Sequence, residues 1–280
     1  MLIIQFSGGL GNQMFLYGLY YSFQKKGINT KIDLSHYATE KNHNGYELEK
    51  VFSFKIKSAN QTENFIYSKI SKLLHLLTQR PYKEKFLDQY IYNEKVSQIR
   101  FGYLRGYWQS EKYFLDFSNH LRNEFTFPPL IDEKNIEIEN QIRSTNAVSI
   151  HIRRGDYLLS GRKIALDLKY YQRAMEYIHH KITNPVFYVF SDDIKWVKEN
   201  FNNQHITLIN WNTGNNSYID MQLMSLCKHN IIANSSFSWW GAWLNKYSEK
   251  IVIAPAKWMP HLTCSNDLIP KNWVQLNNSF

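Results

Sequence analysis

Five short apolar runs alternate with segments of helical periodicity in the second half of the chain, and this alternation narrows the choice of fold. The runs are rich in Val, Ile, Phe and Tyr, as buried strands are, and lie at 147–152, 186–190, 206–209, 230–233 and 250–254. Helices are expected between them at 167–182, 193–200, 218–229 and 236–247. Strands that alternate with helices predict a parallel, doubly wound α/β sheet. Ligands of such sheets bind beyond the carboxyl ends of the strands, so the residues that follow each strand are the candidates for a site.

The first half opens with a β-α-β pattern. A strand at 2–6, a glycine-rich turn at 7–11, a helix at 12–25 and a strand at 30–34 follow one another. The signal is poorer over 36–100, where a helix is expected at 68–77, and it recovers as a strand at 101–108 and a helix at 111–125. Pro128-Pro129 and the charged stretch 132–139 predict a hinge, which divides the chain into domains 1–140 and 141–280.

Composition limits the function classes. The chain has 280 residues, 44% of them hydrophobic, which is ample for a buried core, and its net charge is +9. The lysines are scattered and no nucleic-acid-binding signature stands out, so we expect no nucleic-acid partner and favour peripheral contact with an anionic membrane. Neither a signal peptide nor a membrane-spanning run is present, and Cys227 and Cys264 form no disulfide framework. A cytoplasmic protein, working at the inner face of the membrane, is therefore expected.

The segment His151-Ile152-Arg153-Arg154-Gly155-Asp156-Tyr157 directly follows the predicted strand 147–152. A guanidinium matches phosphate or carboxylate oxygens bidentately and keeps its proton, so this pair suits a phosphorylated ligand. One arginine is expected to face the ligand while a carboxylate braces the other. His151 alternates with Arg153 and is expected on the same face. The alternative is a surface pair with Asp156 as ion-pair partner or helix cap.

The turn Gly8-Gly9-Leu10-Gly11-Asn12 joins the first predicted strand to the first helix. Its backbone amides and the helix start suit an anion or a sugar. It departs from the dinucleotide fingerprint because Met14 stands where the third glycine belongs, although Asp33 at the end of the second strand fits that fingerprint. The alternative interpretation is a tight turn with Asn12 as the helix cap.

Two later corners carry polar residues. Ser191-Asp192-Asp193 lacks the spacing of a paired-carboxylate metal site, and Ser191 is expected to cap a helix. The stretch from Asn234 to Phe237 offers side-chain hydroxyls and the unpaired backbone amides of a helix start, which suit a phosphate. The alternative is that Ser236 only caps the helix. Trp239, Trp240 and Trp243 are expected to fill the core.

These features together favour a metal-independent transferase with a nucleotide-activated donor, whose diphosphate is neutralised by arginine and backbone amides. They do not reveal the donor. Two other classes stay open: an NAD-dependent sugar-nucleotide oxidoreductase or epimerase, and a basic carbohydrate- or lipid-binding module without catalysis.

Several motifs resemble those of the α1,2-fucosyltransferases of bacteria and eukaryotes. They are GGLGNQMF at 8–15, GYWQSEKYF at 106–114, HIRRGDY at 151–157 and the stretch 220–245, so the resemblance spans nearly the whole chain. It implies a GT-B-type fold, with two Rossmann-like domains facing across a cleft, and no metal. It also implies inverting transfer of L-fucose from GDP-β-L-fucose to the 2-hydroxyl of a terminal galactose, as in surface polysaccharide or O-antigen synthesis. A fucosyltransferase of another linkage fits the same motifs.

The same resemblance implies roles for individual residues. Arg153 would contact the donor diphosphate and Asn12 would reach the donor from the facing domain; these two are the catalytic candidates. Asp220 would recognise the guanine ring. The full donor-binding set that the motifs imply is Gly9, Gly11, His151, Arg154, Asp192, Asp220, Ser235, Ser236 and Phe237. No spacing identifies a general base; Asp156, Asp33 and His36 qualify only by residue type.

Overall fold

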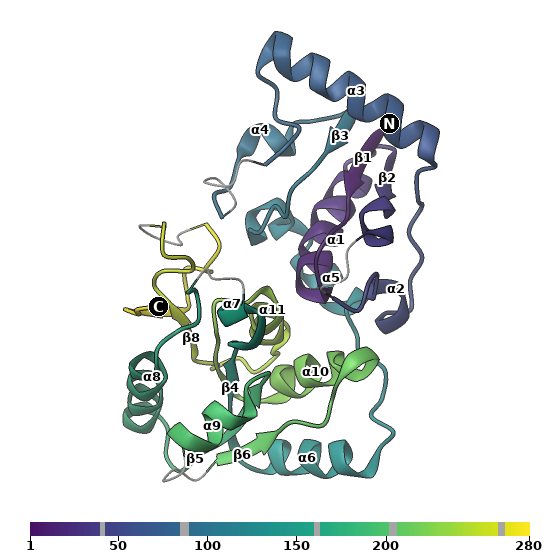
Figure 1. Ribbon diagram of the computed structural model, residues 1–280. Coiled ribbons are helices and arrows are strands. Elements are labelled where there is room, and N and C mark those ends of the chain that lie inside the picture. Colours follow the sequence, from purple (N-terminus) through teal and green to yellow (C-terminus); the bar gives the residue numbers. More distant parts are fainter. Residues whose placement is uncertain (40–42, 85–89, 160–162, 202–205, 263–266) are drawn as a thin grey trace. The chain divides into compact units, whose positions relative to one another are not determined.

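The computed structural model describes residues 1–39, 43–84, 90–159, 163–201, 206–262 and 267–280, so Cys264 lies outside the described residues. The chain forms two compact units (Figure 1). Unit 1 comprises Met1–Phe127 and Asn266–Pro270, and unit 2 comprises Pro128–Ser265 and Lys271–Phe280.

The division therefore falls at Pro128 rather than between 140 and 141. The charged stretch 132–139, which we had expected to be a hinge, belongs to helix α6 (Glu133–Ser144). The side chain of Asp132 caps this helix by accepting a hydrogen bond from the backbone amide of Asn135 at 2.9 Å. Ile138 and Ile142 bury the other side of α6 against unit 2, which an amphipathic helix does and a solvated linker does not.

Unit 2 contains a six-stranded parallel sheet in the order β6-β5-β4-β7-β8-β9. Counted from β4, this is the order 3-2-1-4-5-6 of the Rossmann fold, and the direction of winding reverses between β4 and β7. The five predicted strands are present, and a sixth, β9, was not expected. Their bounds are β4 (Asn146–Ile152), β5 (Pro185–Ser191), β6 (Ile206–Ile209), β7 (His229–Ile231), β8 (Val252–Pro255) and β9 (Val274–Leu276).

Helices cover both faces of this sheet. Val148, Ile150 and Ile152 of β4 pack in one cluster with α8 (Leu168–Lys181) and α9 (Ile194–Asn200). Ala147, on the opposite face, packs with α6 and α10 (Tyr218–Leu226). Successive residues of β4 face opposite sides of the sheet, and residues 147–152 are all buried, so both faces of the strand are covered, as in a doubly wound sheet.

Helix α11 (Ser236–Leu244) is buried over most of its length. Trp239, Trp240 and Trp243 are at most 2% exposed, which confirms that they fill the core. An added Cβ at Gly241 would lie 3.0 Å from the Cβ of Met224 on α10, so glycine here permits the two helices to approach closely.

Unit 1 contains a three-stranded parallel sheet in the order β2-β1-β3, formed by β1 (Leu2–Gln5), β2 (Thr30–Asp33) and β3 (Gly102–Leu104). Helix α1 (Leu10–Lys25) follows the glycine turn as predicted. The helix expected at 111–125 is instead two 3₁₀ turns, η3 (Glu111–Tyr113) and η4 (Leu115–Phe117), followed by α5 (Ser118–Glu124). Three further short elements are η1 (Ser35–Ala38), α2 (Leu48–Val51) and α4 (Glu94–Ser97).

Helix α3 (Gln61–Thr78) is longer than the helix expected at 68–77. Asn60 and Glu63 form a capping box, which sets the start of the helix earlier than the expected residue 68. The backbone amide of Tyr103 on β3 donates to Ser71 Oγ of α3 at 2.6 Å, so the helix lies directly against the strand. Among the described residues, no helix combines the length and the hydropathy needed to cross a bilayer.

Candidate functional site

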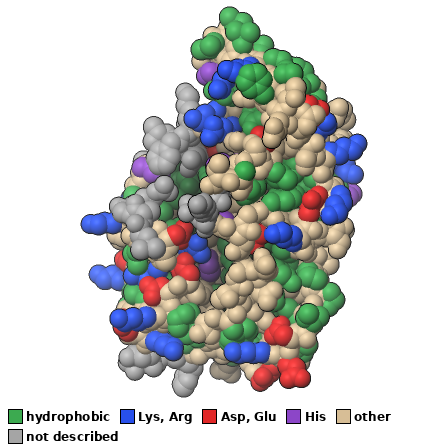
Figure 2. Space-filling model, turned by 45° about the vertical axis from the view of Figure 1, so that its right-hand side comes forward, with side chains coloured by type: hydrophobic (Ala, Val, Ile, Leu, Met, Phe, Trp, Pro, Cys, Tyr) green, Lys and Arg blue, Asp and Glu red, His purple; other side chains and the backbone are tan. Residues whose placement is uncertain are grey.

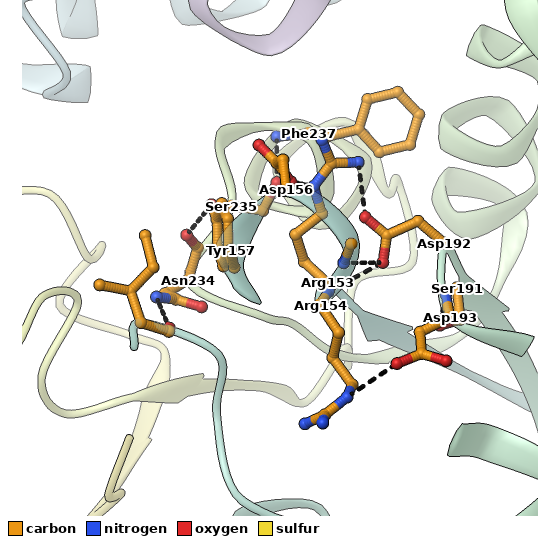
Figure 3. A network of polar contacts seen from close by, with 12 residues as sticks. Arg153, Arg154, Asp156, Tyr157, Ser191, Asp192, Asp193, Asn234, Ser235 and Phe237 are labelled. Carbon is orange, nitrogen blue, oxygen red and sulfur yellow. Dashed lines mark hydrogen bonds and ion pairs between the residues drawn. The ribbon is translucent and has the colours of Figure 1, made fainter. Parts of the chain in front are cut away.

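A corner is here the turn between a strand and the helix that follows it. The polar corner at residues 153–157 lies where the winding direction of the unit 2 sheet reverses. Residues 153–157 leave β4 and residues 232–237 leave the neighbouring strand β7. The Tyr157 hydroxyl donates to the backbone carbonyl of Asn234 at 2.9 Å, and the ring centroids of His151 and Phe237 lie 5.8 Å apart. These contacts bring the two corners together (Figure 3). A crevice at such a reversal is where open α/β sheets bind ligands.

Arg153 is held between two carboxylates. Its Nε lies 2.8 Å from Asp156 Oδ1, and its Nη1 lies 3.1 Å from Asp192 Oδ2. Burial alone would lower the pKa of this guanidinium, but the two carboxylates outweigh it and raise the pKa, so the group stays charged. The side chain nevertheless keeps 32% exposure. The charge is therefore fixed in position and open to an anion.

Arg154 points the other way, as Figure 3 shows. Its Nε pairs with Asp193 Oδ2 at 3.2 Å, and its guanidinium carbon lies 4.2 Å from the ring centroid of Trp196. The side chain is only 17% exposed. Arg154 is thus the arginine that a carboxylate braces, as the sequence predicted. Arg153 also pairs with carboxylates but is the more accessible of the two, and its contact with a ligand stays a prediction.

Asp192 organises this corner. Its Oδ1 accepts hydrogen bonds from the backbone amides of Arg154 at 2.8 Å and Gly155 at 3.1 Å, while its Oδ2 pairs with Arg153. One carboxylate thus fixes both the main chain after β4 and the guanidinium that projects from it. The sequence assigned Asp192 to the donor site, and the structure places it directly beside Arg153, the residue expected to contact the donor diphosphate.

The sequence predicts Ser191 as the cap of α9, but the cap in the structure is Asp193. Asp193 Oδ1 accepts the backbone amide of Trp196 at 3.0 Å, and Ser191 Oγ accepts the amide of Asp193 at 3.0 Å. The Ser191 hydroxyl, two residues before the cap, supports the turn, and the Asp193 carboxylate caps the helix.

His151 is buried at the end of β4, with 6% exposure, and its Nδ1 has no hydrogen-bond partner among the described residues. Burial, assisted by the positive charge of Arg153, lowers the pKa of His151 to about 3. The imidazole is therefore neutral in the physiological range. A neutral ring with an unsatisfied nitrogen suits a hydrogen bond to a ligand and not the role of a charged acid.

The start of α11 is capped by Ser235 and not by Ser236. Ser235 Oγ accepts the backbone amide of Phe237 at 3.3 Å. The side chain of Asn234, immediately before it, is 1% exposed and donates to the carbonyls of Ile164 and Trp258. Ser236 and Phe237 remain partly exposed at the helix start. The buried side chain of Asn234 thus holds the N-terminus of α11 in place beside Tyr157.

Asp220 belongs to a second polar network. Asn212 Nδ2 donates to Asp220 Oδ1 at 2.8 Å and to Asn135 Oδ1 at 3.1 Å. Asn135 in turn is bound to Asp132 and to the indole of Trp211. Burial raises the pKa of Asp220 to about 7, although the hydrogen bond from Asn212 opposes the shift. The sequence did not indicate Asn135 or Asn212, because neither lies in a recognisable motif.

The glycine turn of unit 1 is arranged differently from what we expected. Gly9 is the N-cap of α1, and Asn12 lies inside the helix, with Gln109 donating to its side chain. The interpretation of Asn12 as the cap was therefore wrong. Gly11 is buried in the first turn of the helix. Gly8 has φ +74°, the left-handed region that favours glycine.

A carboxylate of the chain itself lies at the N-terminus of α1. Glu47 is 5% exposed; burial raises its pKa, and hydrogen bonds from Asn44 and from the backbone amide of Leu10 oppose the shift. Gln13, 0% exposed, holds the segment in place by accepting the amides of Glu47 and Leu48 at 2.9 and 3.1 Å. Since Glu47 already supplies the negative charge that a helix start attracts, this turn is less suited to a phosphate than the sequence suggested.

Asp33 is likewise occupied. Its two oxygens accept hydrogen bonds from the Tyr103 hydroxyl at 2.6 Å, the Asn64 side chain at 2.7 Å and the Ser35 amide at 2.8 Å. A carboxylate with three donors anchors unit 1 and is poorly placed to bind a ribose or to act as a base. His36 lies in η1 and is partly exposed. Within the described ranges, no group of three or more His, Cys, Asp or Glu side chains has the arrangement of a metal site.

Comparison with known proteins gives a consistent picture. The family described as "Glycosyl transferase family 11" matches residues 1–277. An Escherichia coli protein named alpha-1,2-colitosyltransferase is 36% identical over 99% of both chains. The E. coli O-antigen biosynthesis glycosyltransferase WbnK is 32% identical over 96% of this chain and 98% of its own. Human galactoside alpha-(1,2)-fucosyltransferase 1 is 26% identical over 60% of this chain and 50% of its own.

Among solved structures, the fucosyltransferase NodZ from Bradyrhizobium is similar with a TM-score of 0.51 and 11% identity, covering 86% of this chain and 91% of NodZ. At that identity the likeness concerns the fold alone. Together with the two parallel α/β units, it confirms the expected GT-B class.

The two carboxylates on Arg153 allow a matched test of which one organises the corner. We expect Asp192→Ala to lower the free energy of unfolding by about 1–3 kcal/mol, because it leaves two backbone amides without an acceptor and removes one of the two carboxylates on Arg153. Asp156→Ala removes only a half-exposed ion pair and is expected to cost less than about 1 kcal/mol. Urea unfolding of both variants measures the difference. Equal losses would show that Asp192 has no special structural role.

Proposed function

Because the chain belongs to glycosyl transferase family 11, we propose that it transfers L-fucose from GDP-β-L-fucose to the 2-hydroxyl of a terminal galactose in a surface glycan. The transfer inverts the anomeric configuration and requires no metal ion. The observation that carries the proposal is the charged, partly exposed Arg153 at the reversal of the unit 2 sheet.

Arg153 supplies what the breaking bond requires. As the fucosyl–phosphate bond breaks, positive charge develops on the sugar and negative charge on the departing GDP. A guanidinium that Asp192 already holds in position stabilises that negative charge without reorganising during the reaction. The two phosphates compete mainly with Asp156, whose side chain is 54% exposed, and Asp192 keeps its backbone contacts. Donor binding thus exchanges one carboxylate for a phosphate.

The start of α11 is the second contact for the diphosphate. The Ser236 backbone amide and hydroxyl lie at this helix start, while the Phe237 amide is already bound by the Ser235 cap. The Tyr157 hydroxyl donates to the carbonyl of residue 234 just before the helix, and the guanidinium carbon of Arg153 lies 5.9 Å from the Tyr157 ring centroid. Helix N-termini favour anions through their unpaired amides and their dipole. His151, neutral and with an unsatisfied Nδ1, completes the polar lining on the β4 side.

Asp220 is assigned to the guanine ring. A carboxylate accepts hydrogen bonds from both N1–H and the exocyclic amine of guanine, a pattern that adenine does not offer. Asn212 and Asn135 fix the orientation of the carboxylate. The remaining assignments, Asn12 and the glycines Gly9 and Gly11, concern unit 1, and we keep Asn12 as a residue that contacts the donor. No residue is assigned as a general base: Asp33 is anchored by three donors, and Asp156 qualifies by residue type alone.

Family membership contradicts the oxidoreductase or epimerase alternative, and so does the occupied carboxylate of Asp33. One second candidate is supported by a specific observation, the 36% identity to a colitosyltransferase over 99% of both chains. Colitose is L-fucose without its 3-hydroxyl, so the same diphosphate site would serve either donor.

The direct test is incubation of the purified protein with GDP-fucose or GDP-colitose, a panel of galactosides, and EDTA. We expect fucose on O2 of galactose in the α configuration, with a rate that EDTA does not reduce, because the guanidinium replaces a divalent cation. Nuclear magnetic resonance of the product determines the linkage. A strict need for Mn²⁺ or Mg²⁺ contradicts the mechanism, a different linkage contradicts the acceptor assignment, and transfer of colitose alone contradicts the donor assignment.

Replacing Arg153 tests the central contact. Arg153→Ala is expected to lower kcat/KM at least a few hundredfold, which corresponds to about 3–4 kcal/mol of transition-state stabilisation. Arg153→Lys should not restore it, because an ammonium lacks the planar fork. Arg143→Ala on α6 is the matched control, an arginine paired with Glu139 away from this corner. Steady-state kinetics that find normal turnover in Arg153→Ala would remove the assignment.

The raised pKa of Asp220 predicts how GDP binding depends on pH. A carboxyl with a folded pKa of about 7 is ionised above that pH and protonated below it. Only the ionised form accepts two guanine hydrogen bonds, so the dissociation constant for GDP should rise about tenfold from pH 8 to pH 6. Isothermal titration calorimetry of wild type and Asp220→Asn measures this. At each pH, the dissociation constant of wild type is divided by that of Asp220→Asn, which removes the effect of phosphate titration because it is common to both proteins. A ratio that does not change with pH would contradict the guanine assignment.

A further inference from the structure

Helix α3 of unit 1 exposes an apolar stripe that takes no part in the proposed transfer. The exposed fractions are 65% for Phe65, 45% for Ile66, 57% for Leu73 and 73% for each of Leu76 and Leu77. These positions recur at helical spacing and fall on one side of the helix. Figure 2 shows hydrophobic side chains at the top of the view, where α3 lies in Figure 1, beside lysine and arginine side chains.

The opposite side of α3 fixes the helix to unit 1. Ser71 Oγ accepts the Tyr103 amide, Asn64 donates to Asp33, and Glu63 pairs with Lys31 at 2.6 Å. An added Cβ at Gly102 would lie 2.5 Å from Ser71 Oγ, so the helix and β3 are in close contact. The helix cannot turn its apolar stripe inward without breaking these contacts. The stripe is thus a fixed feature of the surface.

The charge around the stripe has one sign. Lys69 and Lys72 lie on the exposed side of α3, and the Lys69 ammonium is 5.4 Å from the ring centroid of Phe65. The sequence from residue 64 to residue 83 has no Asp or Glu, whereas Arg80 and Lys83 follow the helix. Large apolar side chains flanked by lysines are typical of helices that lie in a membrane interface. Long lysine side chains reach the head groups while the apolar side chains enter the acyl boundary.

We propose that the outer side of α3 docks unit 1 on an anionic phospholipid surface. A second copy of the chain fits this side less well, because it would bring the same lysines against one another with no carboxylate between them. The stripe lies along the surface and does not cross the bilayer, since α3 lacks the hydropathy of a membrane span. The occupant is thus a membrane whose head groups carry negative charge.

Vesicle co-sedimentation of the full chain tests the proposal independently of catalysis. Wild type is mixed with vesicles of phosphatidylcholine alone or of phosphatidylcholine and phosphatidylglycerol. We expect binding to the mixed vesicles, at least tenfold weaker binding to the neutral ones, and a decrease with salt. Leu73→Ser/Leu76→Ser/Leu77→Ser should weaken binding by about a hundredfold, and Lys69→Glu/Lys72→Glu by more than tenfold.

Two variants elsewhere on the surface serve as matched controls. Lys195→Glu/Lys198→Glu changes two exposed helical lysines of α9, and Leu115→Ser/Ile131→Ser changes two exposed apolar side chains, at 54% and 91% exposure. Both should bind as wild type does. Circular dichroism and urea unfolding confirm that every variant folds. Failure of wild type to bind anionic vesicles, or equal loss in the control variants, overturns the proposal. So does a dimer in sedimentation velocity that the leucine substitutions abolish without any vesicle binding.

Discussion

One carboxylate, that of Asp192, holds the candidate site together. A chain leaving a parallel strand presents backbone amides and side chains at the same edge of the sheet, and without a partner they would be free to take many arrangements. Asp192 binds two of those amides and one guanidinium at once. The position of Arg153 is therefore fixed before any ligand arrives, which is the condition under which a charge is most effective in catalysis. The neutral His151 and the exposed start of α11 can contribute to binding an anion only because they lie near that fixed charge.

The two strand–turn–helix corners that the sequence treated alike differ in the structure. At α11 the helix start is capped by a neutral serine and remains partly exposed. At α1 the helix start has a carboxylate of the chain, Glu47, bound to it. Both turns have small residues and a helix behind them, and the difference comes from a residue more than thirty positions away in the sequence. Local pattern identifies a corner that could bind an anion, and only the tertiary structure shows whether the protein itself supplies that anion.

The same limit explains how much of the fold could be predicted. The strands of unit 2 that are rich in buried apolar residues were predictable. In β4, residues 147–152 are all buried, and only Ser149 and His151 among them are polar. The helix at 133–144 was missed because its buried apolar residues, Ile138 and Ile142, are few among many charged and polar ones. Caps were misassigned by one or two residues at Ser191 and Ser236, since neighbouring hydroxyls and carboxylates compete for the same amides. The roles of Asn135 and Asn212 could not be predicted, because they depend on a contact between residues that lie 77 positions apart in the sequence.

The chain passes between its two units more than once. It passes from unit 1 to unit 2 at Pro128, returns for Asn266–Pro270, and then ends in unit 2. Within the returning segment, the Asp267 carboxylate accepts the Tyr92 amide at 3.1 Å and pairs with Lys112, and its carbonyl accepts the Ser110 hydroxyl. Unit 1 is thus completed by residues encoded near the end of the sequence. A chimera that exchanges only the first 127 residues with those of a relative would assemble this unit from two parents, so recombination within the family must carry both pieces together.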